Sequence, residues 1–233
     1  MAQSSEPYTG AFFGRRKGKR LRPGQETRLG SDLPRLLLPP DEAALEMAQL
    51  ESLYPFAPER FVLEIGFGGG EHLAHRADEA RSTAFIGVEP FVNGMVKLLA
   101  AVEERALENV RLWNDDASKL LPRLPTGSFD EIYLLYPDPW PKRRMRKRRF
   151  VSPENLAEIA RVVRPGGTFR FASDIDDYVG WTLARIAAEP RLRWTATRAD
   201  DWRKPYPGWP GTRYEAKAVR EGRVPSYLTF ERI

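Results

Sequence analysis

Residues 134–150 read LLYPDPWPKRRMRKRRF, and this stretch gives the clearest indication of the fold. The apolar run that enters it (132–135) ends just before Pro137 and has the character of a buried strand. Asp138 lies between Pro137 and Pro139, which restrict the backbone on both sides, so its carboxylate should have a defined direction. Open α/β sheets bind ligands where their parallel strands end. We therefore expect an α/β sheet with a ligand site around Asp138.

Beyond Trp140, almost every residue of this stretch is cationic. The cations are Lys142, Arg143, Arg144, Arg146, Lys147, Arg148 and Arg149. Such a run repels itself in a free protein and indicates an anionic partner, of which nucleic acid phosphate is the commonest. The alternative is a solvated basic loop, but a Pro-Asp-Pro-Trp sequence has no role in such a loop. Trp140 either packs the loop against the sheet, which we favour, or stacks on an unpaired base.

Strands and helices are expected to alternate along the chain. The expected strands are residues 61–65, 84–88, 110–113, 131–136, 168–172, 192–197 and 226–231. The expected helices are residues 41–53, 71–80, 91–106, 117–121, 153–163, 176–188 and 212–221, with a turn at 164–167 and a loop at 200–211. This alternation predicts βαβ units, and therefore a parallel sheet with helices on both faces. The fold class is α/β, and a chain of 233 residues has the length of one such domain.

The first 40 residues differ in composition from the rest, because they are polar, glycine-rich and basic. Their cations include Arg15, Arg16, Lys17, Lys19, Arg20 and Arg22. Such a segment buries too little apolar surface to fold alone. We expect residues 1–40 to be a flexible arm, either a disordered tail or a segment that orders on an anionic partner, and residues 41–233 to be a single domain. Leu36 to Leu38 can dock the arm onto the domain, and Asp41 can cap the first helix.

Composition disfavours several kinds of site. The chain has no cysteine, which rules out disulfides, thiolate nucleophiles and cysteine metal sites and fits a reducing cytosol. The two histidines, His72 and His75, have the spacing of one helix face, so we interpret them as ordinary helix residues and expect no metal. No apolar run has the length of a membrane span, and the N-terminus lacks the apolar core of a signal peptide. The net charge of +5 favours an acidic partner.

The segment Glu64-Ile65-Gly66-Phe67-Gly68 follows a predicted strand and precedes a predicted helix. Glycines there let the backbone approach a ligand closely, and the helix N-terminus offers unpaired N–H groups. A dinucleotide-binding protein needs a third glycine where this chain has Glu71, whose charge would repel a pyrophosphate. NAD and FAD, and with them the class of nicotinamide oxidoreductases, are therefore disfavoured.

Four carboxylates stand at or beside the ends of successive predicted strands, namely Glu64, Glu89, Asp116 and Asp138. Glu89 follows the glycine loop by roughly twenty residues, the distance at which an acid binds ribose hydroxyls. Asp116 can accept a hydrogen bond from an adenine amino group. Any one of these acids has the alternative role of a helix cap or solvated carboxylate. Together they indicate a cleft for a cationic, phosphate-free adenosine ligand, a description that S-adenosyl-L-methionine fits.

These motifs resemble those of one known family. The matching segments are Glu64 to Gly68, Gly87-Val88-Glu89, Asp116-Ala117, Pro137 to Trp140 with its cationic run, Ser173-Asp174 with Tyr178, Thr212-x-x-Glu215, and the basic lead-in Gly14-Arg15-Arg16. The chain resembles the bacterial tRNA (guanine-N7)-methyltransferase family, of the Rossmann-like class I methyltransferases. The resemblance implies a mostly parallel seven-stranded sheet with helices on both faces and an antiparallel C-terminal strand. It also implies S-adenosyl-L-methionine as cofactor and tRNA as partner.

The resemblance implies roles for individual residues as well. Cofactor contacts would come from Glu64, Gly66, Gly68, Glu89, Asp116 and Asp138, of which Asp138 would also be the catalytic acid. The target nucleotide would meet Lys142, Asp174, Thr212, Arg213, Tyr214 and Glu215. RNA would be held by Arg144, Met145, Arg146, Lys147, Arg148 and Arg149. Whether Asp115 or Asp116 faces adenine stays open, and we choose Asp116 because it precedes Ala117.

The implied activity is methylation of guanine N7 in tRNA, at the variable-loop guanine (position 46), to give 7-methylguanosine. The implied enzyme is cytoplasmic, a monomer or homodimer, and needs no obligate protein partner. Guanine N7 carries a lone pair and no proton, so it needs no general base, and catalysis rests on positioning and on stabilising positive charge. Two alternatives stay open: a class I methyltransferase that acts on another RNA, and a non-catalytic RNA-binding protein that keeps the fold.

Overall fold

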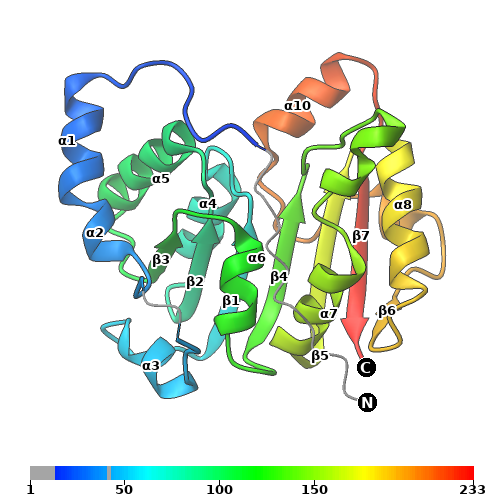
Figure 1. Cartoon of the computed structure of the whole chain (residues 1–233), viewed down its shortest axis with the longest axis horizontal. Coiled ribbons are helices and arrows are strands. Elements are labelled where there is room, and N and C mark those ends of the chain that lie inside the picture. The colour runs from blue at the N-terminus through cyan, green and yellow to red at the C-terminus, as the bar shows by residue number, and fades with distance from the viewer. Residues whose placement is uncertain (1–13, 41–42) are drawn as a thin grey trace.

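The computed structural model describes residues 14–40 and 43–233, and within these ranges the strands form one seven-stranded sheet. The strands are β1 Arg60–Ile65, β2 Thr83–Val88, β3 Val110–Trp113, β4 Phe129–Leu135, β5 Val163–Ser173, β6 Leu192–Trp194 and β7 Ser226–Arg232. Their order is β3-β2-β1-β4-β5-β7-β6, and β7 runs antiparallel to both of its neighbours, β5 and β6, whereas the pairs from β3 to β5 are parallel (Figure 1). The predicted α/β class and the antiparallel C-terminal strand are confirmed.

Helices cover both faces of this sheet (Figure 1). They are α1 Pro23–Ser31, α2 Leu33–Leu36, α3 Met47–Ser52, α4 Glu71–Glu79, α5 Val92–Glu104, α6 Ala117–Leu120, α7 Pro153–Val162, α8 Asp176–Ile186, α9 Asp200–Arg203 and α10 Arg213–Arg220, with the 3₁₀ helices η1 Leu121–Arg123 and η2 Arg143–Arg148. Side chains of α4 and α5 form one apolar core with the sheet, and those of α6, α7 and α8 form the other. Because side chains alternate along a strand, Leu63 of β1 joins one core and Val62 the other. No helix in the described ranges is both long and apolar enough to cross a bilayer.

The N-terminal segment packs beside α5 and β3. Helix α1 lies along α5, where Arg28 forms an ion pair with Glu103 at 2.7 Å (Figure 1). Leu38 is buried, and its N–H donates to the carbonyl of Leu112 in β3 at 2.9 Å. This leucine therefore docks the segment as the sequence suggested, whereas nothing in the sequence pattern indicated α1. The division of the chain into an N-terminal arm and a single domain remains our proposal.

Besides the N-terminal segment, three segments differ from those predicted. The loop expected at 200–211 begins with the short helix α9, Asp200–Arg203. The helix expected over residues 41–53 is reduced to α3, because Glu46 and Gln49 form a capping box that starts it later. The predicted cap, Asp41, lies outside the described residues. The turn expected at 164–167 lies inside β5, where the pairing with β4 shifts register. Glycines permit such a bulge, so the strand continues through a sequence typical of a turn.

Candidate active site

The glycine loop connects β1 to α4 at the carboxyl edge of the sheet. Gly66 and Gly68 have φ angles of +71° and +58°, which L-residues with a side chain rarely adopt. The first turn of α5 packs directly on this loop: a Cβ atom at Gly94 would lie 2.0 Å from the carbonyl oxygen of Gly68. Gly94 therefore supports the glycine loop from behind, although its position within a predicted helix gave no signal of this in the sequence.

Glu89, at the end of β2, ties two neighbouring loops together. Its carboxylate accepts hydrogen bonds from the N–H of Gly68 at 2.7 Å and from the N–H of Phe91 at 3.0 Å. The side chain is buried, and this desolvation raises the pKa of Glu89 by more than the two backbone hydrogen bonds lower it. Glu89 thus lines the cavity and also fixes the glycine loop, a second role that the sequence did not reveal.

Glu64, which the resemblance assigned to the cofactor, faces the protein interior instead. It is 2% exposed, and its Oε2 lies 2.6 Å from Nδ1 of His72 in α4. His72 lies in a helix as predicted, but it is 3% exposed, so it is a buried partner of Glu64, which its spacing did not indicate. A buried carboxylate needs such a partner. We therefore restrict the proposed cofactor-side role of Glu64 to supporting the start of the glycine loop.

Asp115 and Asp116 follow β3 but face different partners. Asp115 accepts hydrogen bonds from Arg16 at 2.6 Å and from Lys119 at 2.8 Å. Burial alone would raise the pKa of Asp115, but the hydrogen bonds from Lys119 and Arg16 outweigh it and lower this pKa to about 2. Asp116 caps α6 through the N–H of Ser118 and lines the cavity. This geometry supports the choice of Asp116 as the acid that faces a ligand.

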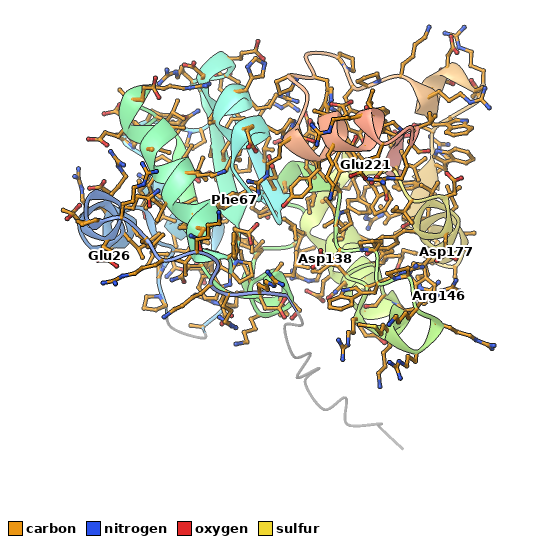
Figure 2. All side chains as sticks on the ribbon, turned by 90° about the horizontal axis from the view of Figure 1, so that it is seen from above. Glu26, Phe67, Asp138, Arg146, Asp177 and Glu221 are labelled. Atoms are coloured by element: carbon orange, nitrogen blue, oxygen red, sulfur yellow. The ribbon has the colours of Figure 1, made fainter. Side chains whose placement is uncertain are left out.

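The Pro-Asp-Pro-Trp loop is held in an unusual backbone conformation. Tyr136 and Trp140, which flank it, have φ angles of +51° and +41°. Such angles are strained for aromatic residues, and strain of this kind gathers at functional sites. Asp138 stands between them and lines the cavity, near the centre of Figure 2. Asp138 remains exposed, but the protein around its carboxyl partly desolvates it, and this raises its pKa.

The cationic run after this loop forms η2 and presents most of its charge to solvent. Lys142, Arg143, Arg144 and Lys147 are exposed, whereas Met145, Arg146 and Arg148 are partly exposed. Arg146 donates to Asp177 of α8 at 2.6 Å, and the pair is visible in Figure 2. The guanidinium of Arg148 lies 5.0 Å from the ring centroid of Trp140. Trp140 thus lines the cavity with a cation over its ring, and its packing role stays a prediction.

Arg149 departs from the other cations of the run, because its side chain has no exposed surface. Its Nε donates to the carbonyl of Pro139 at 2.7 Å, and its guanidinium pairs with Asp177. The same group lies 4.8 Å from the ring centroid of Tyr178 and 4.9 Å from that of Trp181. The sequence grouped Arg149 with the RNA-binding cations, but a guanidinium so enclosed is placed to hold the loop. We therefore leave Arg149 out of the proposed RNA surface.

The two acids assigned to the target nucleotide, Asp174 and Glu215, are each hydrogen-bonded to other side chains. Asp174, after β5, accepts from Nε of Arg223 at 2.5 Å. Glu215 of α10 accepts from Nε1 of Trp209 at 2.7 Å and also from the hydroxyl of Tyr227. Each acid therefore has a partner that fixes its direction. None of these three partners was singled out in the sequence, because a single sequence does not show which distant residues meet.

Helix α10 brings the Thr-x-x-Glu motif against the glycine loop. Thr212 caps the helix and forms a capping box with Glu215. A Cβ atom at Gly68 would lie 3.2 Å from the ring of Tyr214 and 3.3 Å from the guanidinium of Arg213. Residues about 145 positions apart in the sequence thus meet beside the cavity. This agrees with the rule that open α/β sheets form their ligand sites at the carboxyl ends of the strands.

The cavity enclosed by these elements has a volume of about 520 Å³, within the usual range for small-molecule sites. Its lining includes Gly66, Gly68, Glu89, Asp116, Asp138 and Tyr214. Arg15 of the N-terminal segment also borders it. This segment is fastened across the start of α5, where the carbonyl of Arg16 accepts from the N–H of Val92 at 3.0 Å. The basic lead-in is therefore part of the rim of the site.

The fold is that of a class I methyltransferase. Residues 58–226 match the sequence model of a family described as "Putative methyltransferase". The crystal structure of the 16S rRNA methyltransferase KamB superposes with a TM-score of 0.57 at 21% sequence identity, over 81% of this chain and 95% of that chain. A likeness at this identity shows the Rossmann-like methyltransferase fold alone.

Two curated relatives are much closer in sequence. The tRNA (guanine-N(7)-)-methyltransferase of Azorhizobium caulinodans is 55% identical over 232 residues, covering 100% of this chain and 99% of the relative. That of Agrobacterium fabrum is 60% identical over 224 residues, covering 96% of both chains. The chain belongs to the bacterial tRNA (guanine-N7)-methyltransferase family, as its motifs predicted.

Proposed function

We propose that this protein transfers a methyl group from S-adenosyl-L-methionine to N7 of the variable-loop guanine (position 46) of tRNA. The observation that carries this proposal is the near full-length identity to tRNA (guanine-N(7)-)-methyltransferases, combined with an acid-lined cavity beside exposed cations. Since tRNA is the substrate, the proposed compartment is the cytoplasm. The proposed state is a monomer or homodimer that acts without an obligate partner subunit.

The residues around the cavity fit this cofactor. Glycines with left-handed φ angles at 66 and 68 leave the loop without side chains on the ligand side. Glu89 and Asp116 give that cavity negative charge, which suits a ligand with a sulfonium and an amino group and no phosphate. The cofactor supplies an electrophilic methyl group when bound. Glu89 and Asp116 would bind it, and the Glu89 bonds to Gly68 and Phe91 would keep the loop in shape.

The reaction requires no general base from the protein, because guanine N7 carries no proton. The in-plane lone pair of guanine N7 would accept the methyl group that the bound cofactor supplies, so that positive charge would pass from the cofactor to the purine. Asp138, held in a stiff loop at the cavity wall, would stabilise this charge or accept from the N1–H and amino edge of guanine. Asp174 and Glu215, each fixed by its own partners, would share the contacts to that edge.

Binding of tRNA would use the exposed cations around the cavity. In the run after the Pro-Asp-Pro-Trp loop, Lys142, Arg143, Arg144 and Lys147 are exposed, and Met145, Arg146 and Arg148 are partly exposed. The basic lead-in adds Arg15, Lys17 and Lys19, which are also exposed, and Arg15 borders the cavity. A folded RNA is bound mainly through phosphates, so the affinity should fall steeply with salt.

The direct test is methyl transfer to RNA. The purified protein is incubated with labelled S-adenosyl-L-methionine and an unmodified tRNA transcript, and the labelled nucleoside is identified after digestion. We expect 7-methylguanosine. Label in another nucleoside would show a different methyltransferase, and binding of RNA without transfer would favour the non-catalytic alternative. As a check on the cofactor, S-adenosyl-L-methionine should raise the melting temperature, whereas NAD should leave it unchanged.

A further inference from the structure

The indole of Trp209, in the loop between α9 and α10, lies between two carboxylates assigned to opposite sides of the site. On one side its ring lies 5.0 Å from the ring of His72, which pairs with Glu64. On the other side its Nε1 donates to Oε2 of Glu215 at 2.7 Å. One side chain thus connects the base of the glycine loop to the acid of the Thr-x-x-Glu motif.

The surface on which the indole rests is rigid. His72 is buried, its ring lies 4.8 Å from that of Tyr133 in β4, and Nδ1 is held by Glu64. The edges of Tyr206 and Tyr227 close around the indole, with ring centroids 5.6 Å and 5.8 Å from it. An aromatic ring packed on several sides has little freedom to rotate. The direction of the Nε1–H bond is therefore set by the fold.

Glu215 receives more hydrogen bonds than its place in the helix requires. As the third residue of α10 it completes a capping box, for which one bond from the N–H of Thr212 is sufficient. That bond is 3.3 Å long, whereas the bond from Trp209 is 2.7 Å and Tyr227 donates to the other oxygen. The bonds from Trp209 and Tyr227 come from outside the helix. Together they fix the plane of the Glu215 carboxylate. A capping box does not require this plane to be fixed.

We propose that Trp209 is a positioning residue: seated on His72, it orients the carboxylate of Glu215 toward the bound guanine. The inference rests on the proposed function, in which Glu215 contacts the target nucleotide. It assigns to Trp209 no contact with RNA or with the cofactor. Loss of the indole N–H should therefore impair use of the tRNA substrate and leave cofactor binding as it is.

The variant Trp209→Phe keeps an aromatic ring on His72 and removes only the N–H donor and the second ring. A hydrogen bond to a charged group is worth enough to lower kcat/KM for tRNA by roughly ten- to a hundredfold. The Kd for S-adenosyl-L-methionine should stay within about twofold of the wild-type value. Trp202→Phe is the matched control, since Trp202 is also partly buried and, within the described residues, shows no indole hydrogen bond. It should leave both constants unchanged.

A double-mutant cycle separates positioning from packing. Glu215→Gln retains the capping box, because glutamine serves at this position of the box, and removes the charge. If Trp209 acts through Glu215, adding Trp209→Phe to Glu215→Gln should lower kcat/KM by less than about twofold. The inference is overturned if the full loss persists in that background. It is also overturned if the cofactor Kd weakens in parallel, or if the melting temperature falls while kcat/KM is unchanged.

The same assays distinguish failure of this inference from failure of the proposed function. A wild-type protein that makes no 7-methylguanosine contradicts the proposed function and with it the guanine-side role of Glu215. An active wild-type protein whose Trp209→Phe variant is equally active contradicts only the role of Trp209.

Discussion

The Nε of Arg149 donates a hydrogen bond to the carbonyl oxygen of Pro139 at 2.7 Å, so a member of the cationic run holds the backbone next to Asp138. Asp177 and two aromatic rings enclose the same guanidinium. Charge composition suggested RNA binding for this arginine, whereas its surroundings give it a role in shaping the candidate active site. The role of Arg149 can therefore be separated by mutation from that of the exposed cations in the same run.

Arg149→Gln should change turnover and stability but not the electrostatics of RNA binding. Loss of a buried, hydrogen-bonded guanidinium should lower the free energy of unfolding by about 2 kcal/mol and lower kcat. The slope of log K for tRNA against log salt should stay unchanged, since no phosphate contact is lost. Lys147→Gln is the matched comparison. It should leave stability unchanged and reduce the magnitude of that slope by about one, the change expected when one phosphate contact is lost. An equal loss of slope in both variants would place Arg149 on the RNA.

Asp138→Ala should separate catalysis from binding. Removing a carboxylate that faces developing positive charge should lower the single-turnover rate by roughly a hundredfold or more, because such electrostatic groups act mainly in the transition state. The Kd for tRNA should change little, since that affinity comes from cations elsewhere. Rapid-quench kinetics and filter binding measure the two quantities. A variant that keeps most of its rate would show that Asp138 has no catalytic role.

Gly94→Ala should weaken cofactor binding through the glycine loop. The added Cβ would lie 2.0 Å from the carbonyl oxygen of Gly68, so the loop or the start of α5 must move. We expect the Kd for S-adenosyl-L-methionine, measured by calorimetry, to rise at least tenfold. A rise of this size is roughly the effect of one lost contact. Gly180→Ala in α8 is the control, because no atom within 4 Å obstructs its Cβ. That variant should bind the cofactor normally and gain about 0.5–1 kcal/mol of stability. Normal binding by Gly94→Ala would contradict the proposed loop packing.

Asp115→Asn should reveal how the N-terminal segment is fastened. The pKa of this carboxyl falls from 3.8 to about 2 on folding, so its ion pairs with Lys119 and Arg16 contribute stability that is complete above pH 3.8. That contribution is lost as the pH falls toward 2. Allowing for solvent screening, the variant should be about 1 kcal/mol less stable at pH 7. Urea unfolding at a series of pH values measures the difference, and a difference that persists at pH 2 would contradict this assignment.

Much of the fold follows from local pattern, because apolar runs bounded by turn residues mark buried strands. Strand β3 has the bounds predicted for it, and the other parallel strands differ mainly at their ends. Helix α1 could not be predicted in this way, because it buries no residue and is held by contacts such as Arg28 with Glu103. The continuation of β5 through 164–167 was hidden for a different reason, since its glycines are equally compatible with a turn and a bulge.

The candidate site was predictable where function follows from residue type and place in the topology. Glu89, Asp116 and Asp138 all line the cavity, because acids at the carboxyl ends of neighbouring parallel strands converge. Burial and pairing were not predictable from spacing. Glu64 has its buried partner eight residues away in the next helix, and Arg149 looks identical in sequence to its exposed neighbours.

The central claim is methylation of one tRNA guanine at N7, and a position-resolved assay tests it most directly. Two unmodified transcripts are compared, one with the variable-loop guanine and one with adenine in its place, and the products are digested and identified by mass. The account predicts one 7-methylguanosine per molecule in the first transcript and none in the second. Methylation of a different atom, or equal methylation of both transcripts, would contradict it.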